Sequence, residues 1–523
     1  MNADKTNLDE LKCHYDELGV LLQPADYMAN NREYPLDDDV RQKIAEIVIT
    51  DQDNDFKIFN YLDTVKELWP LLICKSILCL RYFDSREPFM EKVEKTPHAY
   101  GVKELNDYFD QYTEFEKTLY GSAKYYRDHV MHVFRVWVLG LNILFRNNGY
   151  YLKNVKIAEG YDINNYEKLS LWTIIALTHD LGYPLEKASQ VIEKTKNMMK
   201  AFVTNPSVDM DVTFSGVQNS MNDFVLRFIS SKMWEIDPDS RKTVERTQES
   251  VEEEMRTREV ELAKGNLEQY LKEKRYVARL QPKYYFKFQK SLEHNEHGVL
   301  SALIIYKVLL YFLESDYSLN EDYMFDYEDT RQFYLRREIL RSMASHTCKD
   351  IYQNDALRFS FLLILCDDAQ DWGRKNITQL YVDNQGGYEF GNVLITEGQP
   401  IQSTISDSYE VTTIETLKLL LDNYKKQCKS YRSLFRDGQD TSKRNFEFKR
   451  SLTMKSTVDG GGRTDYNLTL EVSTDRQTKV VVKRVDETQF NTEDTVIATL
   501  KAIFENEKDD TSDDNRIFTI MIS

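Results

Sequence analysis

The chain has 523 residues and a formal net charge of −18, so it is long enough for two to four domains and its surface is acidic. This balance excludes a general nucleic-acid-binding surface, which needs clustered lysine and arginine, although a local basic pocket remains open. The best apolar run, 300–313, is too short for a membrane span, and the N-terminus shows no signal-peptide pattern. The six cysteines form no Cys-x-x-Cys pair, which favours reduced thiols. We therefore expect a cytoplasmic protein without a membrane segment.

Residues 1–120 are expected to form a helical, tyrosine-rich N-terminal region. The helix predicted next, within 122–145, has a long apolar face and carries His129 and His132. Residues three apart share a face of a helix, and neutral imidazoles at this spacing are good metal ligands. An ordinary pair of core or surface histidines is the simpler interpretation of this pair alone.

The central stretch combines an apolar segment, 169–177, with Thr178, His179, Asp180 and a turn containing Gly182 and Pro184. A helix that is apolar on every side is buried, and glycine and proline end it. His179 and Asp180 should therefore lie at a helix end at the edge of a core. An ionised Asp is costly there unless it is paired or bound to a metal. Taken alone, the dipeptide favours a capped helix end.

A charged helical insertion is expected at about 203–290. Its residues 236–280 are dominated by Glu, Lys and Arg, and four apolar residues follow a sparse heptad-like pattern: Val244, Val251, Met255 and Leu262. A solvated helix is the favoured interpretation. An oligomer contact and a cap over the active site are the alternatives.

Further histidines and acidic residues flank later apolar helices. His294 and His297 begin one helix, His346 ends another, and Asp367 and Asp368 follow the apolar run that starts near 357. Six of the eight histidines thus lie in four clusters beside strongly apolar segments. Such a set can hold two divalent ions with a bridging carboxylate, so we favour a metal site over unrelated core histidines.

The chain beyond this region changes character. Residues 380–402 are expected to form a polar loop with short strand-like pieces, 414–434 a helix and 435–444 a linker. From residue 446 the apolar pattern alternates with period two, which predicts strands. We expect a mainly α protein with three parts: a helical N-terminal region at 1–120, a domain at 121–435 and a small α+β domain at 436–523.

The order His, His-Asp, His, His, Asp resembles the HD-domain superfamily of metal-dependent phosphohydrolases over residues 122–372. The resemblance implies a helical core and six metal ligands: His132, His179, Asp180, His297, His346 and Asp367. His294 competes with His297, and Asp368 competes with Asp367. Asp180 is expected to bridge two ions, and this donor set suits Mn, Fe, Co, Ni, Zn or Mg.

The resemblance also suggests roles beyond the ligands. Asp180 would act in catalysis through the ions, and His129 would protonate the leaving oxygen or support a ligand. Four cations are candidates for holding phosphate: Lys124, Arg127, Lys187 and Arg374. The pattern departs from some triphosphohydrolases of the superfamily, because Tyr183 stands where they have a histidine.

Two enzymatic functions fit this resemblance. The first is hydrolysis of nucleoside triphosphates, with deoxynucleotides preferred, by an enzyme that resembles regulated antiviral effectors which deplete nucleotides. The second is a phosphodiesterase acting on a cyclic mono- or oligonucleotide. A non-catalytic nucleotide sensor or scaffold ranks third, because all six ligands are present. We expect a homo-oligomer with a nucleotide substrate and a possible nucleotide effector.

Overall fold

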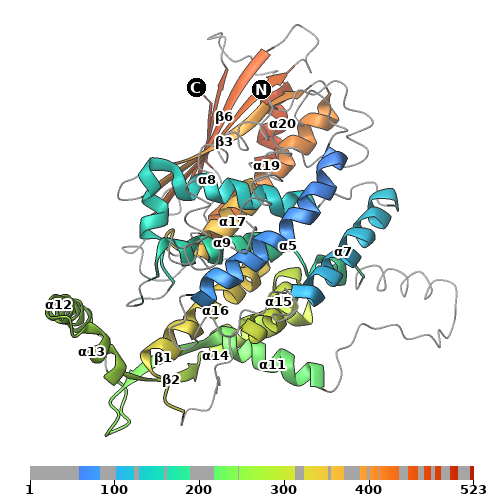
Figure 1. The fold of residues 1–523 in the computed structure, drawn as a ribbon. Helices are drawn as coiled ribbons and strands as arrows, with labels where there is room; N and C mark the ends of the chain where they lie inside the picture. The colour runs from blue at the N-terminus through green and yellow to red at the C-terminus, as the bar shows by residue number, and fades with distance from the viewer. Residues whose placement is uncertain are drawn as a thin grey trace, which may run out of the picture.

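The computed structural model shows a mainly helical chain with a sheet near its C-terminus (Figure 1), as predicted for the fold class. It describes residues 58–82, 102–122, 129–157, 161, 163–188, 217–244, 247–312, 323–351, 355–369, 389–396, 401–411, 413–434, 446–456, 464–472, 478–484, 495–504 and 519–522. Among these residues, no helix is both long and apolar enough to cross a membrane.

The helical body is built around α9 (Asn165–Thr178), whose residues from Glu167 onward are all buried. The other helices of the body are α5 (Ile58–Tyr82), α7 (Val102–Ser122), α8 (Val130–Asn154), α11 (Val217–Ser230), α14 (Pro282–Glu293), α15 (His297–Phe312), α16 (Tyr327–Thr347) and α17 (Phe359–Ala369). Helices α5, α8, α16 and α17 pack around α9, which explains why its sequence is apolar on every side.

Hydrogen bonds fix both ends of α9. At its start, Asn164 and Glu167 form a reciprocal capping box, and Glu167 also pairs with Arg331 of α16. At its end, the indole of Trp69 on α5 donates to the carbonyl of Leu177 over 2.8 Å. The residues that follow α9 are therefore held in a fixed place inside the body.

The region predicted as a purely helical insertion also contains two strands. Strand β1 (Ser231–Ile236) pairs antiparallel with β2 (Arg275–Leu280), and between them lie α12 (Gln248–Lys264) and α13 (Leu267–Glu273). The two strands were not predicted, because the charges on β1 concealed its alternation of buried and exposed residues, and β2 has three consecutive buried residues instead. Figure 1 shows α12 and α13 projecting from the body beyond the strand pair. We call residues 231–280 the arm.

The C-terminal sheet has six strands in the order β3-β4-β5-β6-β7-β8. They are β3 (Glu389–Thr396), β4 (Ile401–Val411), β5 (Phe446–Ser456), β6 (Thr464–Val472), β7 (Thr478–Arg484) and β8 (Thr519–Ile522). The pairs β4–β5 and β7–β8 are parallel, and the other pairs are antiparallel. A parallel pair needs a crossover, and the crossovers contain α19 (Ile414–Leu434) and α20 (Thr495–Phe504).

This topology carries the sheet across the domain boundary expected at residue 436. Strands β3 and β4 precede that boundary, and α19 is the crossover that makes the parallel β4–β5 pair possible. Tyr424 of α19 donates to the carbonyl of Arg450 in β5, and Lys425 donates to the carbonyl of Ile503 in α20. The sheet with its two helices therefore begins at Glu389. The linker expected at 435–444 lies outside the described residues.

Candidate metal centre

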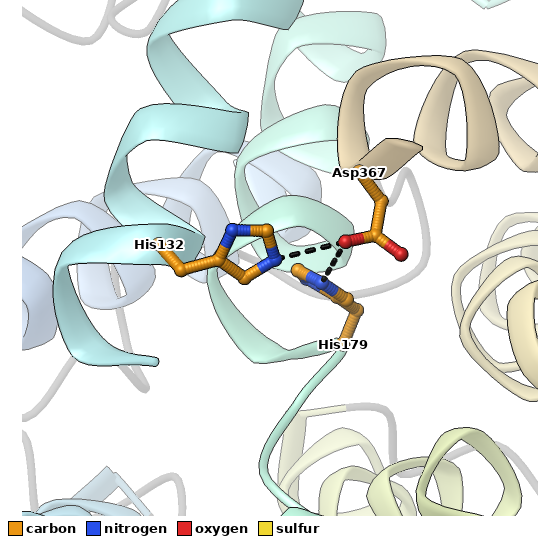
Figure 2. Close-up of side chains that lie close together, drawn as sticks. All are labelled: His132, His179 and Asp367. Atoms are coloured by element: carbon orange, nitrogen blue, oxygen red, sulfur yellow. Dashed lines mark hydrogen bonds and ion pairs between the residues drawn. The ribbon is translucent and has the colours of Figure 1, made fainter. Parts of the chain in front are cut away.

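Six side chains that lie far apart in the sequence meet inside the helical body. His132 comes from the first turn of α8, His179 and Asp180 directly follow α9, and Asp367 lies in the last turn of α17. His297 begins α15 and His346 lies in the last turn of α16. Figure 2 shows three of them, with the rings of His132 and His179 directed at the carboxylate of Asp367.

Two glycines allow these elements to come together. A Cβ atom on Gly182 would lie 2.4 Å from the carbonyl oxygen of His297, so only glycine lets the turn after Asp180 reach the start of α15. A Cβ atom on Gly298 would lie 2.6 Å from the carbonyl oxygen of Met343, which keeps α15 close to the end of α16. The Gly182 amide also donates to Ser301 Oγ over 2.7 Å.

The first half of the cluster lies between α8, α9 and α17. His132 Nε2 lies 2.8 Å from Asp367 Oδ1 and 3.6 Å from Asp180 Oδ2. His179 Nε2 lies 3.5 Å from Asp180 Oδ1 and 3.8 Å from Asp367 Oδ1. His179 is fully buried, yet its Nε2 atom has no hydrogen-bond partner among the described residues. An unsatisfied imidazole nitrogen that faces two carboxylates is well suited to a cation.

The second half faces the other side of Asp180. Asp180 Oδ1 lies 3.2 Å from His297 Nε2 and 3.7 Å from His346 Nε2. The two Nε2 atoms are 3.1 Å apart. Asp180 therefore has one carboxylate that contacts four imidazoles, as a bridging ligand would.

The opposite nitrogen of three of these imidazoles is already engaged. The Nδ1 atoms of His179 and His346 donate to the carbonyls of Ala176 and Met343, over 2.8 and 2.6 Å. His297 Nδ1 donates to Glu186 Oε2 over 2.6 Å. A proton on Nδ1 leaves the Nε2 lone pair of a neutral ring free, and in all three rings Nε2 is the atom that faces Asp180. This is the arrangement by which proteins orient histidine ligands to a metal.

Facing lone pairs on His297 and His346 repel unless a cation lies between them. Burial lowers the pKa of His297, but its bonds to Asp180 and Glu186 outweigh burial and raise the pKa to about 10. Burial also lowers the pKa of His346, and the charges of His297 and His179 lower it further. A proton on His297 therefore takes the place of a cation when none is bound, and metal binding would release it.

The two aspartates are held ionised in spite of their burial. Burial alone would raise the pKa of Asp180, but the nearby rings of His179, His297 and His346 hold it well below its ordinary value. Asp367 behaves in the same way, because its hydrogen bond with His132 and the nearby ring of His179 lower its pKa against the effect of burial. Two overlapping groups could each hold a metal ion: His132, His179 and Asp367, and His179, Asp180 and His346.

Glu186 is a functional candidate that sequence reasoning missed. It lies in the helical turn at 183–188, where it accepts from both the backbone amide and Nδ1 of His297. Burial raises its pKa, but the bonds to His297 prevail and lower it to about 2. A carboxylate one turn beyond the His-Asp pair was the available signal, because a ligating histidine needs an acceptor for its second nitrogen.

An aromatic stack lies beside the cluster. The ring of Tyr183 stacks on the buried His129, with 3.8 Å between ring centroids, and lies edge-on to His297. Lys187 Nζ lies 4.7 Å from the centroid of the Tyr183 ring and 3.5 Å from Glu186 Oε1. His129, the expected proton donor, lies next to the expected ligand His132 and contacts Tyr183. Lys187, an expected phosphate-binding cation, contacts Glu186, which binds the ring of His297.

The remaining expected residues are placed as follows. His294 is exposed and its Nδ1 donates to the carbonyl of Lys290, so His297 is the histidine of this pair that joins the cluster. Asp367, rather than its neighbour Asp368, contacts His132 and His179. The other three expected phosphate-binding cations, Lys124, Arg127 and Arg374, lie outside the described residues.

Comparison with known proteins returned no match to a family model, to a curated protein or to a solved structure. The functional argument therefore depends on the chemistry of the cluster.

Proposed function

We propose that this protein is a metal-dependent phosphohydrolase that acts on nucleotides, with nucleoside triphosphates, deoxynucleotides first, as its substrates. The observation that carries the proposal is the convergence on Asp180 of Nε2 atoms from four histidines, two of them buried and two half-buried, with Asp367 beside them. Buried polar groups in this number are costly unless they are paired with one another or with a bound ion. The order of these residues along the chain resembles the HD-domain superfamily, which supports the same reaction class.

The six side chains would hold two ions, with Asp180 shared between them. Imidazole and carboxylate ligands suit Mn, Fe, Co, Ni or Zn, and Mg is accepted through the carboxylates. Bound ions of this kind supply an acidified water and positive charge for phosphate oxygens. The protein supplies the rest: Glu186 fixes the ring of His297, and backbone carbonyls fix the rings of His179 and His346.

Two residues beside the ligands are suited to contact the substrate. Lys187 places a cation near the cluster, where it would offset the negative charge of a phosphate chain. His129 stacks on Tyr183 next to His132 and would donate a proton to the leaving oxygen.

The experiment is a substrate panel on the full chain, loaded with Mn²⁺ and tested against dNTPs, NTPs and cyclic nucleotides. The proposal expects release of triphosphate or phosphate from dNTPs, lost in the His179→Ala/Asp180→Ala variant. His294→Ala is the matched control, because this exposed histidine lies outside the cluster, and its activity should equal that of the parent. Linear nucleotide from a cyclic substrate would change the substrate class to a diester. Metal-loaded protein that hydrolyses nothing in the panel would overturn the enzymatic proposal.

A further inference from the structure

The arm carries most of the exposed large apolar side chains in the described part of the chain. Five of these nine residues lie within 231–280, although this is the most highly charged segment: Trp234, Val244, Met255, Val260 and Leu262. Exposed apolar side chains that gather on one element indicate an interaction surface. The arm is therefore the first place to look for a partner.

Helix α12 turns several charged residues toward its own chain and leaves Met255, Val260 and Leu262 exposed among further charged residues. Glu254, Arg258 and Glu261 share one side of the helix and are half-buried. Glu254 accepts from Lys274 over 2.8 Å, and the Arg258 guanidinium lies 5.6 Å from the ring centroid of Tyr327. A surface helix normally shows the reverse, with its apolar side packed on the protein.

The apolar side of α12 is a short strip. Met255 and Leu262 are two turns apart, so they lie on one side of the helix, and they are 62% and 65% exposed. Val260 is also exposed, at 48%, but its position in the helix places it on a different side.

The charges beside this strip favour one orientation of two paired α12 helices, the antiparallel one. The exposed flank carries Arg256 and then Glu259, a cation followed three residues later by an anion. In an antiparallel two-fold pair this flank meets its own copy in reverse order, so the cation meets the anion. In a parallel pair this flank would meet the opposite flank, where Arg258 and Glu261 face their own chain. The contact of Arg256 with Glu252 is 4.0 Å long and exposed, so it is weak enough to be exchanged.

We propose that α12 pairs antiparallel with α12 of a second copy of this chain, so that Met255 of each copy packs on Leu262 of the other. The contact has two-fold symmetry, which is the commonest arrangement of homodimers. The proposal stands independently of the proposed function, because no residue of the arm belongs to the metal centre.

The first test measures the mass of the full chain by sedimentation equilibrium over a range of concentrations. The parent should show a monomer–dimer equilibrium, and Met255→Glu/Leu262→Glu should remain monomeric. Val260→Glu is the control on another side of the same helix and should dimerise like the parent. A parent that is monomeric throughout, or a double variant that dimerises like the parent, would overturn the proposal.

The charges test the orientation. Arg256→Glu should weaken the dimer by about tenfold, because the exposed flank then meets its own copy with like charges. Adding Glu259→Arg exchanges the signs and should restore the parent affinity. Failure of the second change to restore affinity would exclude the antiparallel flank pairing.

Cysteine cross-linking gives a second measure of orientation. A mixture of Met255→Cys and Leu262→Cys proteins should form a disulfide-linked dimer under mild oxidation, and neither variant alone should do so. Cross-links within each single variant would indicate a parallel pair and contradict the proposal. The wild-type chain serves as the background for its own thiols, of which Cys74, Cys79, Cys348 and Cys366 are buried.

Discussion

The metal centre and the arm each invert the usual distribution of polarity, and they do so in opposite senses. In the centre, histidines and aspartates lie inside an apolar body, where every neighbouring helix is packed. In the arm, apolar residues of α12 lie outside, while three of its charged residues, Glu254, Arg258 and Glu261, face inward. An inverted pattern is stable only when something satisfies it. The comparison teaches that a bound cation would stabilise the polar groups of the centre, and that contact with a second protein surface would cover the apolar residues of the arm.

The largest effect is expected from Asp180→Ala, because Asp180 is the carboxylate that contacts both halves of the centre. We expect loss of bound metal and a fall in turnover of at least about 1000-fold, consistent with removing a shared ligand of a metal site. Elemental analysis of the purified variant, alongside activity on the best substrate, checks this. Parent-like metal content in the variant would show that Asp180 is not a ligand.

The next effect comes from Gly298→Ala, which tests whether the centre depends on close helix packing. The added Cβ would lie 2.6 Å from the carbonyl oxygen of Met343 and 3.0 Å from His346 Nδ1, so α15 and α16 must separate. We expect the free energy of unfolding to fall by about 1–3 kcal/mol, as for other overpacked cores. Chemical denaturation measures this loss. An unchanged free energy of unfolding would mean that the two helices are not held at this distance.

A smaller effect on the same centre is expected from Glu186→Gln, which keeps the shape but removes the charge that orients His297. We expect metal affinity to fall by about 10- to 100-fold, the usual result of losing an outer-shell partner. Glu293→Gln is a matched control on the exposed end of α14 and should bind metal like the parent. Equal affinities in the two variants would remove Glu186 from the site.

The smallest effect is expected when the arm is changed and the centre is measured. Met255→Glu/Leu262→Glu replaces exposed residues, so the free energy of unfolding at a concentration where the chain is monomeric should stay within about 0.5 kcal/mol of the parent. Metal content per chain should also be unchanged. A loss of metal in this variant would show that the two regions are coupled and would break the comparison.

The sequence allowed prediction of the elements that have the same surroundings on every side. Helix α9 is buried on every side, so its apolar run indicated both its burial and the place where His179 and Asp180 emerge. The cluster was foreseeable because most of its members lie on or beside apolar helices, although His346 ends α16, whose composition is polar. Glu186 was missed because it follows the turn at Gly182 and Pro184, and its partner His297 is 111 residues away.

The arm and the sheet were harder to predict for physical reasons. Strands β1 and β2 are only six residues long each and carry charges, so their alternation was weaker than the charge pattern of α12. Helix α19 looked like part of the helical body, and the parallel pairing of β4 with β5, together with its hydrogen bonds to β5 and α20, assigns it to the sheet. Pairing between distant segments is a property of the fold and leaves little trace in local composition.

The measurement that tests the central claim most directly is an anomalous difference map from crystals of the full chain grown with Mn²⁺. The account predicts two peaks on either side of Asp180, one among His132, His179 and Asp367 and the other at His297 and His346. A map with no peak, and with the imidazoles in direct hydrogen-bonded contact with the two aspartates, would contradict the account and make the cluster a structural network.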